Sequence, residues 1–315
     1  MSVLVYTESW DGSFRKSTFE AASYASETAK ILGTEVIAIS LGEVSSDELD
    51  KLGNYGVSKV VSCSAIEKGD GQAATNAIAK ITDDANILIF SNTNTAKMIA
   101  PRLSAKLKVG IVSNVIGLSE STNPLQVKRK AFSSKAIELA TVNTATAILA
   151  IAPNSFKLIE TGGNCTIEEV ATNEKGAITI EGKEPASGKI SISEAEIVVS
   201  AGRGLKGPEN WGMIEELAEL LGAATACSKP VADIGWRPHA EHVGQTGKVV
   251  AADLYFAIGI SGAIQHLAGV NSSKVMVAIN TDPEAPFFKA ADYGIVGDAF
   301  EVVPKLIEEI KQLKG

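Results

Sequence analysis

Residues 254–269 read LYFAIGISGAIQHLAG, a short apolar run that passes through a glycine turn into a helical pattern. The run Leu254–Ile258 is apolar throughout, which is typical of a strand buried on both faces of a sheet. Ser261 fits the N-cap of the following helix, and the small residues Gly262 and Ala263 would let a phosphate approach its first free amides. This unit predicts an α/β fold with a phosphate-binding site at the start of the helix. The alternative is an ordinary capped crossover helix that binds no phosphate.

The same alternation of strand and helix runs along the whole chain. The predicted strands are Val3–Tyr6, Val36–Leu41, Lys59–Ser62, Ile87–Phe90, Ala147–Ala152, Ile197–Ser200, Leu254–Ile258 and Val275–Ile279. Helices are predicted over about 19–32 and 211–221 and from about Val302, with Pro304 in the first turn of the last. Repeated β-then-α units predict open parallel sheets with helices on both faces.

The length of 315 residues suits two domains at about 100–200 residues each. Residues 153–192 lose the strong periodicity and are polar and rich in Gly and Pro. We place the linker near Glu184–Ser191 and expect an N-terminal α/β domain over 1–187 and a C-terminal domain over 188–315.

Composition and charge exclude several classes of protein. The chain carries 29 Lys and Arg against 37 Asp and Glu, a net charge of −8, which argues against binding to nucleic acid or to an anionic membrane. No apolar run reaches the roughly 18–20 residues of a membrane span. The N-terminus lacks a basic n-region or an Arg-rich presequence, so we expect a cytoplasmic protein. Cys63, Cys165 and Cys227 lie far apart, which predicts reduced thiols and no zinc site.

Glycine-rich turns gather in the C-terminal half. Residues 202–207 form a literal G-x-G-x-x-G, but Pro208 follows at once and the helix begins only near Trp211, which departs from the dinucleotide-binding pattern. A glycine turn that lets the backbone and Arg203 approach an anion is our interpretation, and a purely structural turn is the alternative. Residues 244–248, GQTGK, lack the flanking residues of a nucleotide-hydrolase loop.

Three further positions have competing interpretations. Asn280 follows the strand Val275–Ile279 and could bind ribose or adenine, whereas the turn after it, with two prolines, needs no function. Asp298 could bind ribose hydroxyls or cap the last helix. His266, a turn along its helix, is by itself better explained by packing or capping than by ligand binding.

Taken together, VGQTGK at 243–248, the stretch 254–269, VAINTDPEAPFF at 277–288 and ADYGIVGD at 291–298 closely resemble the FAD domain of the electron transfer flavoprotein α-subunit family. The resemblance extends back through SAGRGLKGPEN to about residue 197, and faintly to APRLSAKL at 100–107. It implies two Rossmann-like α/β domains, the C-terminal one binding flavin.

Residue by residue, the resemblance implies a set of FAD-binding positions. These are Arg203, Ser228, Lys229, Val243, Gly244, Gln245, Thr246, Ser261, Gly262, Ala263, Ile264, Gln265, His266, Asn280, Asp298 and Ala299. It places Thr246 near flavin N5 and His266 at the N1/O2 edge, where reduction adds negative charge that a donor or cation would stabilise. Lys229 stands where the family usually has Arg, so the point charge of an ammonium group replaces a planar guanidinium. Arg237 is a candidate to compensate in part for the missing guanidinium.

The resemblance also implies a function. We expect an electron carrier, not an enzyme with its own substrate, that accepts electrons from flavin dehydrogenases such as acyl-CoA dehydrogenases and passes them to a quinone-linked oxidoreductase. Its first domain would pair with a β subunit that commonly carries AMP. The alternatives are the α subunit of an electron-bifurcating, NADH-oxidising flavoprotein and, built on residues 202–207, an NAD-dependent dehydrogenase.

Overall fold

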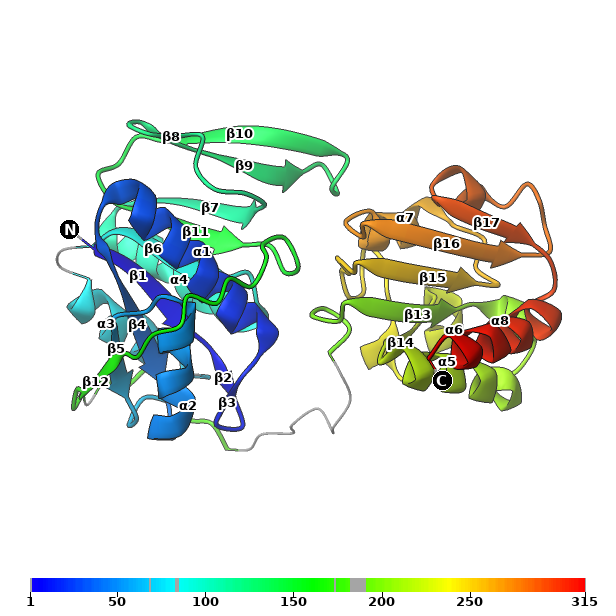
Figure 1. Cartoon of the computed structure of the whole chain (residues 1–315), viewed down its shortest axis with the longest axis horizontal. Coiled ribbons are helices and arrows are strands. Elements are labelled where there is room, and N and C mark those ends of the chain that lie inside the picture. Colours follow the sequence, from blue (N-terminus) through cyan, green and yellow to red (C-terminus); the bar gives the residue numbers. More distant parts are fainter. Residues whose placement is uncertain (1, 68, 83–84, 173, 182–190, 315) are drawn as a thin grey trace. The chain divides into compact units, whose positions relative to one another are not determined.

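The computed structural model describes residues 2–67, 69–82, 85–172, 174–181 and 191–314 (Figure 1). These separate into two compact units, the first formed by 2–132 and 136–181 and the second by 133–135 and 191–314. The predicted linker near Glu184–Ser191 lies almost wholly outside the described residues, and the boundary between 187 and 188 stays a prediction.

The first unit is built on a large sheet whose strands are mostly parallel (Figure 1). Its order is β10-β9-β7-β11-β6-β1-β4-β5-β12, with β8 paired to β9. The strands are β1 (Ser2–Thr7), β4 (Glu35–Leu41), β5 (Lys59–Cys63), β6 (Ala85–Ser91), β7 (Gly110–Val115), β8 (Ser121–Thr122), β9 (Leu125–Ala131), β10 (Ala136–Val142), β11 (Ala147–Ile151) and β12 (Thr166–Glu169). Strands β9 and β10 form an antiparallel edge, and a small separate hairpin joins β2 (Ser9–Trp10) to β3 (Ser13–Phe14).

Helices cover both faces of this sheet. On one face α1 (Lys16–Leu32) packs its small residues Ala22 and Ala25 against the strands. It is followed by Gly33 in the left-handed conformation and ends at residue 32, as the predicted helix over 19–32 does. On the other face lie α3 (Gly71–Ile81) and α4 (Asn94–Leu107). The short α2 (Ser46–Asp50) is capped by the Ser45 side chain.

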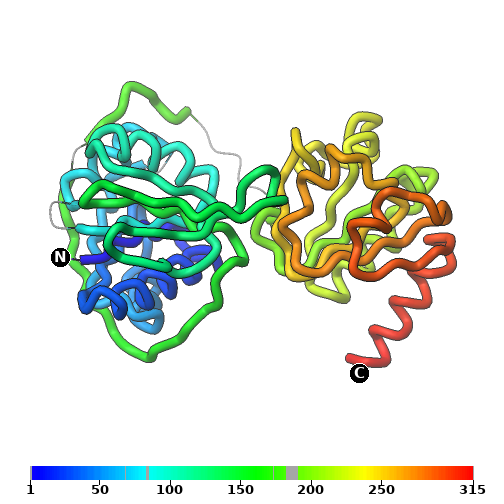
Figure 2. The backbone as a smooth tube through the Cα atoms, turned by 90° about the horizontal axis from the view of Figure 1, so that it is seen from above, coloured from blue at the N-terminus to red at the C-terminus, as the bar shows by residue number. Residues whose placement is uncertain are grey.

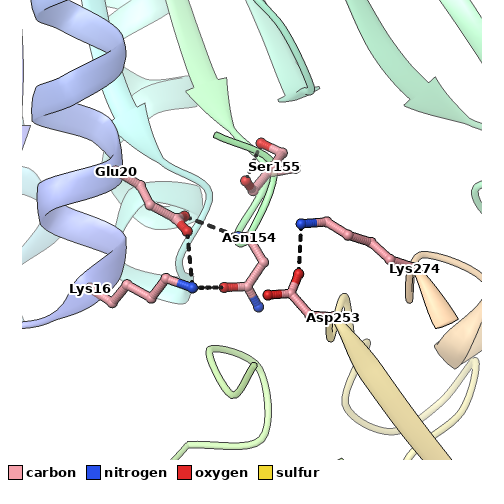
Figure 3. A network of polar contacts seen from close by, with 7 residues as sticks. Lys16, Glu20, Asn154, Ser155, Asp253 and Lys274 are labelled. Atoms are coloured by element: carbon pink, nitrogen blue, oxygen red, sulfur yellow. Dashed lines mark hydrogen bonds and ion pairs between the residues drawn. The ribbon is translucent and has the colours of Figure 1, made fainter. Parts of the chain in front are cut away.

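A buried carboxylate ties α1 to the segment that follows β11 (Figure 3). Glu20 is 2% exposed and accepts a 3.0 Å hydrogen bond from the backbone N–H of Asn154. Lys16 lies 3.7 Å from Glu20 and donates at 3.1 Å to Oδ1 of Asn154. The charge of Glu20 is thus satisfied inside the unit, as a buried ion requires. Within the second unit, Lys274 and Asp253 form an ion pair at 2.6 Å (Figure 3).

The second unit is an all-parallel, five-stranded sheet in the order β14-β13-β15-β16-β17 (Figure 1). The strands are β13 (Ile197–Ala201), β14 (Ala224–Cys227), β15 (Leu254–Ile258), β16 (Val275–Asn280) and β17 (Tyr293–Val296). On one face pack α5 (Gly212–Leu221) and α8 (Ala299–Lys314), and on the other α7 (Ile264–Val270). Figure 2 shows the backbone of these strands and helices as a tube, in a view turned by 90° from that of Figure 1.

The structure confirms the eight predicted strands and the two-sided α/β architecture. Two of the predicted helix starts differ here: α1 begins at Lys16, before residue 19, and α8 begins at Ala299, so Pro304 lies in its second turn instead of its first. The segment 153–192 is also less irregular than expected, because it contributes β12, which pairs with β5. In the part of the chain that is described, no helix is long and apolar enough to cross a membrane.

Candidate functional site

The candidate residues of the second unit gather at one edge of its sheet. Because all five strands are parallel, their carboxyl ends meet at the same edge. Arg203 follows β13, Ser228 and Lys229 follow β14, Ser261 to Gln265 follow β15, Asn280 ends β16, and Asp298 with Ala299 follows β17. The chain passes from β13 outward to β14 and returns to β15 on the other side, which makes the β13/β15 crevice the switch point where such sheets bind ligands.

Glycines at this switch point let two loops pack backbone against backbone. A Cβ on Gly204 would lie 2.6 Å from the Cα of Gly259, and one on Gly202 would lie 2.3 Å from the Gly259 carbonyl oxygen. Gly259 itself has a φ of 60°, in the left-handed region. The first two glycines of the G-x-G-x-x-G are therefore required by the protein's own packing, while Arg203 between them is exposed.

The helix after β15 begins later than the sequence suggests. Ser261 was predicted as its N-cap, but α7 starts at Ile264 and its N-cap is Ala263, whose side chain makes no capping bond. The prediction was wrong because Gly262, at a φ of 86°, adds a left-handed residue to the turn. Within the described chain, the amides of Ile264 and Gln265 have no acceptor, so they are available to an anion.

Gly262 also holds this turn against the short helix at Pro286–Lys289. A Cβ at position 262 would lie 2.4 Å from the Phe287 nitrogen, which donates at 3.0 Å to the Ser261 carbonyl. A side chain at 262 would therefore disturb the wall of the site itself.

A second wall comes from residues 243–248. The Gln245 amide donates to the Gln265 carbonyl at 2.7 Å, and a Cβ on Gly269 would lie 2.5 Å from the Gly244 Cα. These contacts join 243–246 to 261–266, as we expect if both segments line one FAD site. Val243 and Gly244 are buried, whereas Gln245, Thr246 and Gln265 are exposed at the surface of this junction.

His266 lies inside the unit. It is 7% exposed, its Nε2 lies 3.0 Å from the Tyr255 hydroxyl, and its ring contacts Phe287. Burial, helped by the neighbouring His242, lowers the pKa of His266 to about 4, an effect that the Val243 backbone opposes. The imidazole is therefore neutral near pH 7.

The low pKa of His266 predicts acid lability. Its ordinary pKa is 6.5, so below that pH the unfolded chain binds a proton that the folded chain refuses until about pH 4. Stability is therefore lost as the pH falls between these values, by about 2 kcal/mol from pH 7 to pH 5. Urea unfolding followed by Trp fluorescence measures the loss. His266→Gln should flatten this dependence; an unchanged slope in that variant would contradict the assignment.

Arg237 does not replace the arginine that Lys229 lacks. Its Nε and Nη2 donate to Glu241 at 2.7 and 2.6 Å, Nη1 donates to Glu215 at 2.8 Å, and the guanidinium lies 5.4 Å from the Trp211 ring centroid. These partners raise its pKa and hold it as a structural ion pair. Lys229, at the start of α6 (Lys229–Asp233), is exposed and remains the available cation after β14.

Two predicted residues make structural bonds at the edge. Asn280 donates through Nδ2 to the Ile260 carbonyl at 3.1 Å, which links the loops after β15 and β16. Asp298 accepts from the Phe300 amide at 3.0 Å and so caps α8, the alternative that the sequence raised; its other oxygen lies 3.5 Å from Lys206. Ser228, the N-cap residue of α6, is buried and makes no side-chain capping bond.

Sequence reasoning missed Tyr255 and His242, the two side chains that surround His266. The available signal was a tyrosine in the middle of an apolar strand, since a buried hydroxyl needs a polar partner. His242 is buried beside Gly247, and burial also lowers its pKa.

This arrangement suits an anionic dinucleotide such as FAD. Free amides at the start of α7 would hold phosphate, and the turn around Gly262 keeps side chains away from them. The exposed groups of Thr246, Gln265 and Lys229 supply polar contacts and a positive charge at the same edge. The donors present therefore fit the cofactor that the resemblance implies.

Comparison with known proteins agrees with this site. A family model described as the electron transfer flavoprotein FAD-binding domain matches residues 191–271, and the electron transfer flavoprotein domain matches residues 3–175. The chain is similar to the electron transfer flavoprotein subunit alpha of Bacillus subtilis, with 41% identity over 99% of this chain and 98% of the relative. It is 36% identical to the subunit of the same name from Syntrophomonas wolfei, over 98% of both chains. It is also similar to the protein FixB of Clostridium saccharobutylicum, with 33% identity over 99% and 96%.

These matches cover both units, and the second unit corresponds to the part that binds FAD in electron transfer flavoproteins. The chain belongs to the electron transfer flavoprotein α-subunit family.

Proposed function

We propose that this chain is the FAD-carrying subunit of a heterodimeric electron carrier. It accepts electrons from flavin dehydrogenases, acyl-CoA dehydrogenases among them, and delivers them to a quinone-linked oxidoreductase. The observation that carries the proposal is the junction of 243–246 with 261–266 beside the β13/β15 switch point, joined by the 2.7 Å bond from Gln245 to Gln265.

Bound FAD supplies the electron-transfer chemistry that amino-acid side chains lack. In our proposal the amides of Ile264 and Gln265 hold the pyrophosphate, and Thr246 and His266 face the flavin ring. Lys229 adds a positive charge at the same edge. The remaining residues predicted from the resemblance shape the loops that carry these groups.

The first unit, which we assign to residues 1–187, pairs with a β subunit that carries AMP. Its antiparallel edge supports this role, because Phe132, Ile137 and Leu139 are 80%, 66% and 51% exposed. Large apolar side chains gathered on a surface favour burial against another chain. The bifurcating alternative depends on a second flavin in that β subunit. The dehydrogenase alternative is weakened, because the glycines at 202 and 204 already have a packing role.

The experiment mixes the FAD-loaded complex anaerobically with an acyl-CoA dehydrogenase and its substrate. The proposal expects the visible flavin band of the complex to bleach at once and to recover when a quinone-linked oxidoreductase and an excess of its quinone are added. NADH, given without the dehydrogenase, should leave the band unchanged. Bleaching by NADH alone would favour the bifurcating alternative, and no bleaching by a panel of flavin dehydrogenases would refute the carrier role.

His266→Ala should lower the potential of the first one-electron step. Removal of a hydrogen bond to a charged group forfeits about 1.5–3 kcal/mol, which corresponds to about 60–130 mV. The variant should also melt at a lower temperature, since the buried Tyr255 hydroxyl loses its 3.0 Å contact with Nε2 of His266. Redox titration of the FAD-loaded protein measures the shift, with the exposed His239→Ala as control. An unshifted potential with FAD fully bound would end the role assigned to His266.

A further inference from the structure

The first unit has a switch point of its own, between β1 and β6. The chain passes from β1 to β4 and β5 on one side of β1 and returns to β6 on the other side. Strands β13, β14 and β15 follow the same order in the second unit. The helix after the returning strand is α4 in the first unit and α7 in the second. Each unit therefore places the start of a helix at the crevice where such sheets bind ligands.

A carboxylate fills this position in the first unit. Glu8 comes directly after β1, and Thr93 and Thr95 stand at the N-cap and the second position of α4. The Thr93 hydroxyl donates to one carboxylate oxygen of Glu8 at 2.5 Å, and the Thr95 hydroxyl donates to the other at 2.6 Å. The Thr18 hydroxyl of α1 donates to the Glu8 carbonyl at 2.6 Å and so holds the backbone there. Both oxygens of the charged group are thus bound at the start of α4.

The start of α4 would otherwise attract an anion from outside. Its first turn contains no acidic residue, and among the described residues the amides of Asn94 and Thr95 have no acceptor. A helix N-terminus carries a partial positive charge that favours a carboxylate or a phosphate. Glu8, which is half-buried, supplies this negative charge from the neighbouring strand. In the second unit the residue after β13 is Gly202, which has no side chain to do the same.

We propose that Glu8 is an internal anion that closes the first unit to the phosphate group of a nucleotide. It lies where a phosphate would meet the start of α4, so the chain itself fills this switch point. A nucleotide would have to displace a carboxylate that two hydroxyl groups hold. The inference concerns the first unit alone and does not depend on whether the second unit binds FAD.

The test compares the full-length chain with its Glu8→Ala variant, which vacates the position. Thermal melts are recorded in phosphate and in chloride at equal ionic strength, and ¹H–¹⁵N NMR follows the Asn94 and Thr95 amides. Phosphate should raise the melting temperature of Glu8→Ala about 2–4 °C more than that of wild type. It should shift the two amide signals in the variant and leave them unchanged in wild type. Any effect of phosphate on the second unit is common to both proteins and cancels in the difference.

Glu8→Gln separates the charge of the side chain from its size. This variant should melt about 2–4 °C below wild type, since the start of α4 loses its anion. Phosphate should raise its melting temperature no more than that of wild type, because the glutamine still fills the position. The matched control is Glu27→Ala, which makes the same change in net charge as Glu8→Ala but lies within α1, away from its start. Phosphate should affect this control and wild type equally.

Three results would overturn the proposal. A shift of the Asn94 and Thr95 amides of wild type in phosphate would show that the position is open. No additional effect of phosphate on Glu8→Ala would show that Glu8 only caps α4. If Glu8→Ala does not fold, the other proteins decide, and Glu8→Gln melting at the wild-type temperature would show that the charge of Glu8 has no role at α4. A chain that binds no FAD would refute the proposed function and leave all these results unchanged.

Discussion

Ala263→Asp should lower FAD affinity roughly 100-fold without lowering the stability of the apoprotein. Like charges about 4 Å apart repel by about 4 kcal/mol near a protein surface. Salt screens part of this repulsion, and the remainder lowers the affinity about 100-fold. Ala263 is the N-cap of α7 with extended backbone, at a φ of −55° and a ψ of 145°, and it is exposed. Aspartate suits such a position and should stabilise the helix by about 0.5–2 kcal/mol. The substitution therefore moves binding and folding in opposite directions.

Ala263→Asn is the matched control, because asparagine caps a helix equally well but carries no charge. It should retain most of the FAD affinity. Fluorescence titration with FAD and a thermal melt of each apoprotein measure the two effects. If Asp and Asn at position 263 bind FAD equally well, the pyrophosphate does not lie at the start of α7.

Gly259→Ala should destabilise the second unit by about 2–5 kcal/mol. A left-handed conformation costs an L-residue about 1–2 kcal/mol, and overpacking adds about 1–3 kcal/mol. The φ of Gly259 is 60°, and its added Cβ would lie 2.8 Å from the Cα of Gly204, a backbone atom that cannot rotate away. The two loops at the switch point would have to separate.

Gly222→Ala isolates the conformational part of this effect. Gly222 has a φ of 65° in the same unit, and a Cβ there would meet nothing within 4 Å. It should lose only about 1–2 kcal/mol, as measured by urea unfolding. Equal losses in the two variants would show that the close packing of Gly204 on Gly259 carries no stability.

Strands buried on both faces were predictable because their sequences are apolar without interruption. Leu254–Ile258 is such a run, and the structure forms β15 over the same residues. Helix ends were predictable where a glycine was needed, as at Gly33 and Gly222. The gathering of the candidate residues also follows from the sequence, since parallel strands share one carboxyl edge.

Other elements carry little signal in the sequence. Strand β14 consists of the small residues Ala224–Cys227, and every residue of β17, Tyr293–Val296, is exposed. The antiparallel β9 and β10 depend on pairing with each other, which periodicity does not report. The delayed start of α7 depends on the contact between Gly262 and Phe287, residues far apart in sequence.

Side-chain partners inside the site were hidden for the same reason. The bond between Tyr255 and His266 joins a strand to the following helix, and its polar character is visible only once both side chains are seen to be buried. Arg237 looked like a free cation near the flavin until its ion pairs with Glu241 and Glu215 were located. In both cases the tertiary fold decides which group a polar side chain contacts.

The central claim is that FAD in the second unit makes this chain an electron carrier. The most direct test is to count flavins in the purified complex of the full-length chain with its β subunit, by releasing the cofactors and separating flavin from adenine nucleotides. The account predicts one FAD for each copy of this chain, AMP with the β subunit and no second flavin. A colourless complex, or one that holds NAD in place of flavin, would contradict it, and two flavins for each pair of subunits would favour a bifurcating protein.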